Sequence, residues 1–383
     1  MRRPLVTVAA LAAAAALAGC GSLEDVSRGG RVSGDTLTVY SLLPQPGQGD
    51  SRDIVDAEKL ALLDSGGTAG PYAVNFISIS EGRPGDDRVS GGVAVSLRDA
   101  IADPQITAVI GPAATGAATA AVPLLNAAGI LAVTPVAGYA GFTETVHPGE
   151  PDRWQPSGLR TLARLAGHDG AQAEALLAAV REATGERAPR VLVEQEPGAS
   201  ADALVAALRA AGAELVEDPA AADAAVYAGE DPENAAAAAD GLAREAPDLA
   251  IVLPDALTRA GVEARLSPAA RRRAVLVSSA PEPGSTPALR RFEQSFRRRF
   301  DRAPGPYAAV GYEAMRTVLA AIARAGDRAG SRQAVIDAYF DPAERRGTLL
   351  GDYRIAPDGR REPAPFTAFR PGEGEPEYLE LGP

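Results

Sequence analysis

The apolar positions of residues 36–134 alternate between the two-residue period of a strand and the spacing of a helix. Helical spacing is found over residues 50–63, over residues 93–101 and in a small-residue stretch that begins near Thr115. The strand-like runs between these helices are residues 36–43, 72–80, 106–110 and 130–134. Strands that alternate with helices in this way predict a doubly wound parallel sheet.

A second series with the same alternation occupies residues 170–279, and it predicts a second parallel sheet with its own core. Its strands are expected at residues 190–194, 214–217, 224–228, 249–254 and 274–279. Its helices are expected at residues 170–184, 200–211 and 233–243. The predicted fold class is therefore α/β, with two doubly wound parallel-sheet lobes.

The last hundred residues return to helical spacing before they end in strands. Apolar residues 289, 292, 296 and 300 form a helical stripe, and residues 307–325 predict a long amphipathic helix. Residues 347–355 and 365–369 flank an Asp-Gly turn at positions 358 and 359. That turn predicts a terminal hairpin between the two segments.

The strands at residues 106–110 and 130–134 enclose one helix, so they form a βαβ unit with parallel strands. The turns that follow them should lie side by side at the edge where open α/β sheets bind ligands. Thr115 and Gly116 stand where the helix begins, so backbone N–H groups there predict a site for a carboxylate-sized anion. The alternative is an ordinary βαβ unit in which Thr115 caps the helix.

The first 20 residues are predicted to be a signal peptide and not part of the fold. Two arginines precede an apolar stretch, and residues 17–20 have the sequence Leu-Ala-Gly-Cys. This tetrad resembles the bacterial lipobox, which implies a lipid anchor on Cys20 and an extracytoplasmic protein held at the cell membrane. The alternative is a plain secretory signal with a chance cysteine. Residues 21–33 are polar and predict a flexible tether.

Composition excludes several classes of function. The chain has 50 acidic and 38 basic residues, a net charge of −12, which argues against a nucleic-acid partner. A single cysteine excludes a disulfide framework and a cysteine-rich zinc site. The two histidines lie far apart, and the sequence has no metalloprotease, P-loop or nucleophile-elbow motif. We therefore expect no enzyme activity, no metal and no cofactor.

Five short segments have the spacing of known motifs. They are VIGP at 109–112, LAVTP at 131–135, RT at 160–161 with DGAQ at 169–172, AAVGYEA at 308–314, and GDYRI at 351–355 with DG at 358–359. In this order they resemble the type I periplasmic binding proteins, in particular the leucine/isoleucine/valine-binding branch of ABC importers. The resemblance extends over nearly all of the chain after the signal peptide. It implies two lobes that are joined by a multi-strand hinge and close around a ligand.

The resemblance also divides the chain. It assigns residues 34–161 and 282–345 to an amino-terminal lobe, and residues 162–281 and 346–383 to a carboxyl-terminal lobe. The ligand in this family lies between the lobes, with its carboxylate on the first lobe and its ammonium on an acid of the second. We expect a monomer that delivers its ligand to an ABC permease in the membrane.

Carried over by position, these roles fall on particular residues. The hydroxyl that meets the carboxylate corresponds to Thr115, and the backbone amides correspond to Val136 and Gly138. The acid that meets the ammonium corresponds to Asp255, and the residue that lines the first loop corresponds to Gln48. Asp255 has an alternative role, as the cap of a helix that begins one residue later.

Two further residues are candidates for the site. Tyr139 follows the second turn, where it is expected either to stack on a ligand or to pack at the rim of the cleft. Asp231 follows another acid, Glu230, and the pair is expected either to attract a cation or to lie in a solvated loop.

Together these features predict an extracytoplasmic binding lipoprotein that captures an amino acid or a similar small zwitterion or organic anion. The alternative is a sensory or ligand-independent envelope lipoprotein that uses the same fold as a protein-interaction module. The small number of side-chain donors near Thr115, where Ala113 and Ala114 precede it, favours this alternative.

Overall fold

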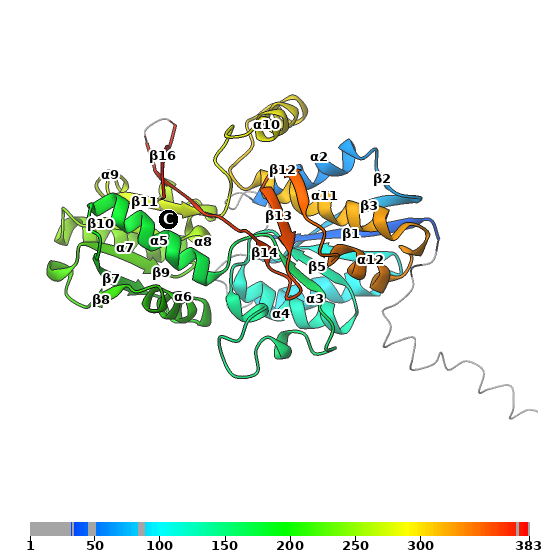
Figure 1. Ribbon diagram of the computed structural model, residues 1–383, viewed down its shortest axis with the longest axis horizontal. Coiled ribbons are helices and arrows are strands. Elements are labelled where there is room, and N and C mark those ends of the chain that lie inside the picture. The colour runs from blue at the N-terminus through cyan, green and yellow to red at the C-terminus, as the bar shows by residue number, and fades with distance from the viewer. Residues whose placement is uncertain (1–31, 33, 45–50, 83–88, 373–374, 382–383) are drawn as a thin grey trace, which may run out of the picture.

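The computed structural model describes residues 32, 34–44, 51–82, 89–372 and 375–381. They form two α/β lobes beside each other, each built on its own largely parallel sheet, with a small third sheet on the first lobe (Figure 1). The α/β fold class with two doubly wound lobes is confirmed. In the part of the chain described, no helix is long and apolar enough to cross a membrane.

The sheet of the first lobe has six strands. In spatial order they are β2 (Thr68–Ala69), β3 (Tyr72–Ser80), β1 (Thr36–Leu43), β4 (Ile106–Ile110), β5 (Leu131–Thr134) and β6 (Leu162–Arg164). All pairs are parallel except β2 with β3. The helices of this lobe are α2 (Ser51–Asp64), α3 (Val89–Ala102), α4 (Thr115–Ala127), α11 (Ala308–Ala325) and α12 (Arg332–Tyr339). The predicted βαβ unit is confirmed, because β4 and β5 pair in parallel around α4.

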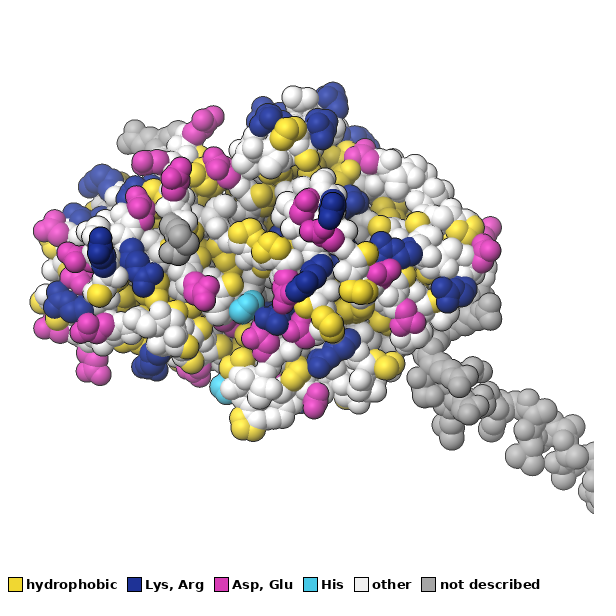
Figure 2. Space-filling view, in the orientation of Figure 1, with side chains coloured by type: hydrophobic (Ala, Val, Ile, Leu, Met, Phe, Trp, Pro, Cys, Tyr) yellow, Lys and Arg dark blue, Asp and Glu magenta, His cyan; other side chains and the backbone are white. Residues whose placement is uncertain are grey.

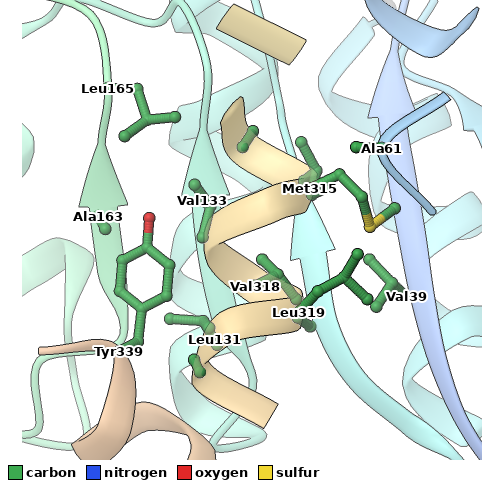
Figure 3. Packing of buried hydrophobic residues seen from close by; sticks show 14 of the residues in the cluster. Val39, Ala61, Leu131, Val133, Ala163, Leu165, Met315, Val318, Leu319 and Tyr339 are labelled. Carbon is green, nitrogen blue, oxygen red and sulfur yellow. The ribbon is translucent and has the colours of Figure 1, made fainter. Parts of the chain in front are cut away.

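Helix α11 lies against the centre of this sheet, although it is about 200 residues away in sequence. Figure 3 shows its Val318 and Leu319 among Val39, Leu131 and Val133 of the strands, and all five belong to one buried cluster. Strands covered on both faces favour continuous apolar runs, and β4 and β5 are buried at every position. The helix predicted at residues 307–325 matches α11 in length, and α11 covers one face of the first lobe's sheet.

Helix α11 also approaches α2 closely. At Gly311 an added Cβ would lie 2.6 Å from the carbonyl oxygen of Ile54 and 3.0 Å from its Cα. A glycine at this point lets two helix backbones touch, and any larger residue would push them apart. This contact fixes the place of α11 against the amino-terminal part of the lobe.

The sheet of the second lobe has seven strands. In spatial order they are β16 (Glu377–Leu379), β15 (Thr367–Arg370), β11 (Ala274–Ser278), β10 (Ala250–Leu253), β9 (Ala224–Ala228), β7 (Arg190–Gln195) and β8 (Glu214–Val216). The strands from β11 to β8 pair in parallel, whereas β15 and β16 are antiparallel. One core contains residues of α5 (Asp169–Thr184) and α6 (Ala199–Ala210). The other contains residues of α7 (Pro232–Glu245), α8 (Asp255–Arg259) and α9 (Pro268–Arg271).

The predicted terminal hairpin is wrong in its second strand. The Asp-Gly turn joins β13 (Gly351–Ile355) to β14 (Arg361–Glu362), and β13 also pairs with β12 (Arg345–Thr348) in the third sheet. The segment expected to complete the hairpin is β15, which pairs with β11 of the second lobe. A turn motif reports only local structure, so it could not show that this strand belongs to a sheet some 90 residues away in sequence.

The chain passes between the lobes three times within the described residues. The connections are residues 165–168 after β6, residues 279–286 before α10 (Pro287–Phe300), and residues 363–366 before β15. A Cβ on Gly167 would overlap the ring of Phe366, so two of the connections touch. The lobe limits expected from the sequence remain a proposal. The sheet assignments favour moving residues 162–164 and 346–362 to the first lobe, where β6 pairs with β5 and Tyr353 joins the core.

Helix α10 is the most basic element of this acidic protein. Leu289, Phe292 and Phe296 are buried, and the helix carries arginines at its solvent-exposed positions, including residues 297–299. Figure 2 shows Lys and Arg side chains gathered over α10, which protrudes from the body in Figure 1. The arginine run at residues 297–299 therefore lies on a solvated face, as its helical spacing predicts.

Candidate functional site

The turn after β4 brings the backbone of the predicted helix start close to neighbouring strands. Gly111 has φ +115°, and a Cβ at this position would overlap the carbonyl oxygen of Leu42, so the turn requires glycine. Helix α4 begins at Thr115, and its N-cap residue is Ala114, which has no capping side chain. The expected capping role of Thr115 is therefore wrong, because Thr115 already lies in the first helical turn.

The backbone N–H groups of this helix start bind a carboxylate from the chain itself. Glu81, which follows β3, accepts hydrogen bonds from the N–H of Ala113 (2.7 Å) and the N–H of Ala114 (3.1 Å). Glu81 is only 1% exposed, and burial raises its pKa to about 7 although the two amides act in the opposite direction. An anion site of the predicted kind thus exists just before Thr115 and Gly116, and the side chain of Glu81 fills it.

The hydroxyl of Thr115 connects the two lobes. Its Oγ1 donates to Oε1 of Glu230 over 2.6 Å, and Glu230 lies between β9 and α7 of the second lobe. The same carboxylate oxygen accepts a hydrogen bond from Ser200 at 3.0 Å. Thr115 is 8% exposed, whereas Gly116 beside it is exposed. The sequence suggested Glu230 only as one of a pair of adjacent acids, and its partner in the other lobe could not be foreseen.

The residues of the second predicted turn bind mostly to other protein groups. Val136 is 2% exposed in the core of the first lobe, and the carbonyl of Gly138 accepts from Nη1 of Arg164 at 2.9 Å. Tyr139 is 1% exposed, and its hydroxyl donates to Glu150 at 2.8 Å. The side chain of Tyr139 therefore packs inside the lobe, which agrees with the packing alternative and not with stacking on a ligand.

Asp255 is buried at the carboxyl end of β10, as expected for the acid of the second lobe. Its carboxylate accepts from the N–H (2.5 Å) and hydroxyl (3.0 Å) of Ser279 and from the hydroxyl of Tyr307 (2.5 Å). Burial raises the pKa of Asp255, against the effect of these donors. The capping alternative is wrong, because α8 begins at Asp255 itself, with Pro254 as N-cap, and the carboxylate turns to other partners.

The remaining predicted site residues lie in different surroundings. Asp231 is the N-cap of α7, and its carboxylate accepts from the N–H groups of Glu233 (2.8 Å) and Asn234 (3.1 Å). This capping role was not anticipated, although Asp before Pro at a helix start is a known signal. Gln48 and Cys20 lie outside the described residues.

A third acid faces the same region from the start of α5. Asp169 accepts a hydrogen bond from the N–H of Ala140 at 2.9 Å, and burial raises its pKa to about 7. The negative charge of Glu230 adds to the rise for both Asp169 and Glu81. Carboxylates from both lobes are therefore near enough to repel one another, which makes this region favourable for positive charge.

Arg259 is a cationic counterpart of Glu81 and Asp255, and the sequence analysis missed it. It ends α8, is 9% exposed, and its Nε is buried without a hydrogen-bond partner. Its charge lowers the pKa of Glu81 in the first lobe and of Asp255 in the second, but neither acid forms an ion pair with it. The one feature of the sequence that could have indicated it is its position, four residues after Asp255, which itself follows a predicted strand.

The arrangement offers charged and hydrogen-bonding groups from both lobes. Within the ranges that the structure covers, no three His, Cys, Asp or Glu side chains gather as metal ligands would. Side chains of the two lobes meet at the Thr115–Glu230 hydrogen bond.

Comparison with solved structures gives clear matches at low sequence identity. The leucine-binding protein LivK of Thermotoga maritima matches with a TM-score of 0.72 and 16% identity, over 90% of this chain and 98% of that one. The fold is that of the type I periplasmic binding proteins. LivJ of Streptococcus pneumoniae, solved with isoleucine, has this fold too (TM-score 0.68, 17% identity, 90% and 99% covered). So does a solute-binding protein of R. palustris, solved with benzoate (TM-score 0.70, 18% identity, 90% and 96% covered).

The resemblance drawn from the five motifs is therefore confirmed for the type I periplasmic binding fold. No protein-family model and no curated protein matches the sequence. At identities this low the likeness establishes architecture, and the ligand has to be argued from the residues of the site.

Proposed function

We propose that this protein is the solute-binding component of an ABC importer and that it captures a small molecule between its lobes. The hydrogen bond from Thr115 to Glu230 carries this proposal, because it joins the two lobes at the carboxyl ends of their strands. Open α/β sheets bind ligands at this edge. Solved proteins of the same fold are described as binding leucine, isoleucine or benzoate, which supports a small organic ligand.

The ligand we propose is an amino acid or a similar small zwitterion or organic anion. The protein would bind this molecule without converting it and would deliver it to a membrane permease. It would act outside the cytoplasm as a monomer, held to the membrane by a lipid on Cys20. Ligand binding would favour the closed arrangement of the lobes by the difference between its affinities for the closed and open forms.

A thermal-shift screen tests this proposal. The purified protein is heated with each of the 20 standard amino acids, their amides and a set of small carboxylates. A ligand present at 100 times its Kd should stabilise the folded state by about 2.7 kcal/mol, which is a readily measured rise in Tm. The absence of any rise across the set would remove the solute-binding proposal.

A second candidate function is supported by the same contacts. Glu81 occupies amides, and Glu230 occupies a hydroxyl, that a small ligand would otherwise use. A ligand-independent envelope lipoprotein, closed by its own side chains, would need no solute to hold its lobes together. This alternative predicts no response to the small-molecule set, together with stable binding to a protein of the cell envelope.

A further inference from the structure

The two backbone amides just before Thr115 are not available to a negatively charged ligand. The N–H groups of Ala113 and Ala114 both bind the carboxylate of Glu81, which is 1% exposed. An incoming carboxylate would have to displace that buried group or lie beside a like charge. The negative end of a ligand therefore needs a partner other than these two amides.

Arg259 has the properties of such a partner. Its side chain is about nine-tenths buried, and among the described residues no hydrogen bond or ion pair satisfies its guanidinium. Buried cations are normally paired, and a guanidinium presents a planar fork that matches a carboxylate in two hydrogen bonds. Arg259 ends α8, the short helix that begins at Asp255 beyond the carboxyl end of β10. Its charge lowers the pKa of Glu81 in the first lobe, which agrees with a place on the side of the second lobe that faces the first.

The two acids that feel the charge of Arg259 do not satisfy it. The carboxylate of Glu81 is held by backbone amides, and that of Asp255 is held by Ser279 and Tyr307. Both acids balance the charge of Arg259 at a distance while their own hydrogen bonds are made to other groups. The fork of Arg259 thus remains available for an additional carboxylate.

We propose that Arg259 binds the carboxylate of a zwitterionic ligand, and that the ammonium group lies toward Glu230 in the region between the lobes. The inference rests on the proposed solute-binding function and specifies the polarity of the ligand. It reverses the polarity that the family resemblance assigns, in which the first lobe meets the carboxylate and Asp255 meets the ammonium.

The acids around Thr115 support this orientation. The charge of Glu230 raises the pKa of both Glu81 and Asp169, so a positive group that enters near Glu230 relieves this repulsion. Glu230 uses its Oε1 for the hydroxyls of Thr115 and Ser200, so its second oxygen is the natural acceptor for an ammonium. A neutral amide or a simple amine would satisfy only one end of this arrangement.

The test compares ligands that differ only in the charged group. Each amino acid that raises the Tm of the full-length protein is titrated by calorimetry, together with its carboxamide and its deaminated acid. The wild type should bind the amino acid on the order of 10- to 100-fold more tightly than the amide, because a charge-assisted bidentate contact is lost. In Arg259→Gln the affinities for the amino acid and for its amide should become similar. A purely structural effect of the substitution would instead weaken the binding of both ligands by the same factor.

Two controls keep the result interpretable. Arg265→Gln removes the same charge from the same lobe, where Arg265 pairs with the exposed Glu233, and it should leave the preference for the acid intact. Arg259→Lys keeps the charge without the fork and should retain part of the preference, which also covers the case that Arg259→Gln folds poorly.

The outcomes separate the two claims. If an amino acid binds and Arg259→Gln or Arg259→Lys keeps the full preference for it over its amide, the assignment of Arg259 is wrong and the solute-binding function stands. If no amino acid binds the wild type, both the assignment and the zwitterion-binding function are overturned.

Discussion

The hydrogen bond between Thr115 and Glu230 gives a direct way to change the balance between closed and open lobes. The hydroxyl of Thr115, at the start of α4 in the first lobe, donates to the carboxylate of Glu230 in the second lobe over 2.6 Å. Replacement of Thr115 by Val keeps the size and branching of the side chain and removes the hydroxyl. The carboxylate of Glu230 then loses one donor and faces a methyl group.

The size of the effect follows from the type of bond. A hydrogen bond to a charged group contributes about 1.5–3 kcal/mol, and each 1.4 kcal/mol is a factor of about ten in an equilibrium constant. Thr115→Val should therefore shift the equilibrium between closed and open lobes toward the open form by roughly 10- to 150-fold. Ser200 still donates to Glu230, so the second lobe itself should remain folded.

The assay is the distance between dyes on the two lobes, measured by energy transfer in single molecules. Leu63 in α2 and Arg209 in α6 are both exposed, and both are replaced by cysteine after Cys20 has been changed to serine. The matched control is Thr119→Val, since that hydroxyl bonds only to the carbonyl of Gly116 within the same helix. Equal distance distributions in Thr115→Val, Thr119→Val and the wild type would refute the role of this hydrogen bond in closure.

Other consequences concern the stability of the first lobe. Glu58 is fully buried, and among the described residues neither oxygen of its carboxylate has a hydrogen bond of normal geometry. Burial raises its pKa from 4.5 to about 8, against a smaller opposite effect of the nearby Ser41 hydroxyl. A carboxyl group whose pKa is raised in the folded state stabilises that state fully below pH 4.5, and this contribution is lost as the pH rises toward 8. Glu58→Gln has no such charge to bury, so at pH 8 it should be more stable than the wild type by up to about 4 kcal/mol, measured by urea unfolding. Gly311→Ala should cost about 1–3 kcal/mol in the same measurement, because its Cβ would press on Ile54. Gly241→Ala in α7, where an added Cβ meets nothing within 4 Å, should instead gain about 0.5–1 kcal/mol.

Each of these stability predictions has a contrary result. A difference between Glu58→Gln and the wild type that is the same at pH 4 and pH 8 would contradict the raised pKa of Glu58. Equal effects of Gly311→Ala and Gly241→Ala would contradict the close approach of α11 to α2.

The strands and helices could be predicted from the sequence because their signals are local. The strands at 36–43, 72–80 and 106–110 have the bounds that the apolar runs indicate. The pairing of β4 with β5 follows from the βαβ rule alone. The pairing of β15 with β11 could not be predicted, because no turn or periodicity links residues so distant in sequence.

The site was harder to predict than the fold. Thr115, at a predicted helix start, and Asp255, after a predicted strand, took their ligand roles from the family resemblance, and both are buried. Their actual partners, Glu230 for the first and Tyr307 for the second, come from distant parts of the chain. Glu81 lies just after the strand predicted at residues 72–80 and outside every predicted helix, so no local pattern indicated that its carboxylate turns back onto backbone amides.

The central claim is that a small molecule is held between the two lobes, and one measurement tests it most directly. The labelled Thr115→Val protein, with its lobes released from their own hydrogen bond, is titrated with the 20 standard amino acids while the distance between the lobes is recorded. We predict that at least one amino acid returns the distance to the value of the closed wild type, with saturation at one molecule per chain. A distance that none of them changes would contradict capture of an amino acid by closure of the lobes.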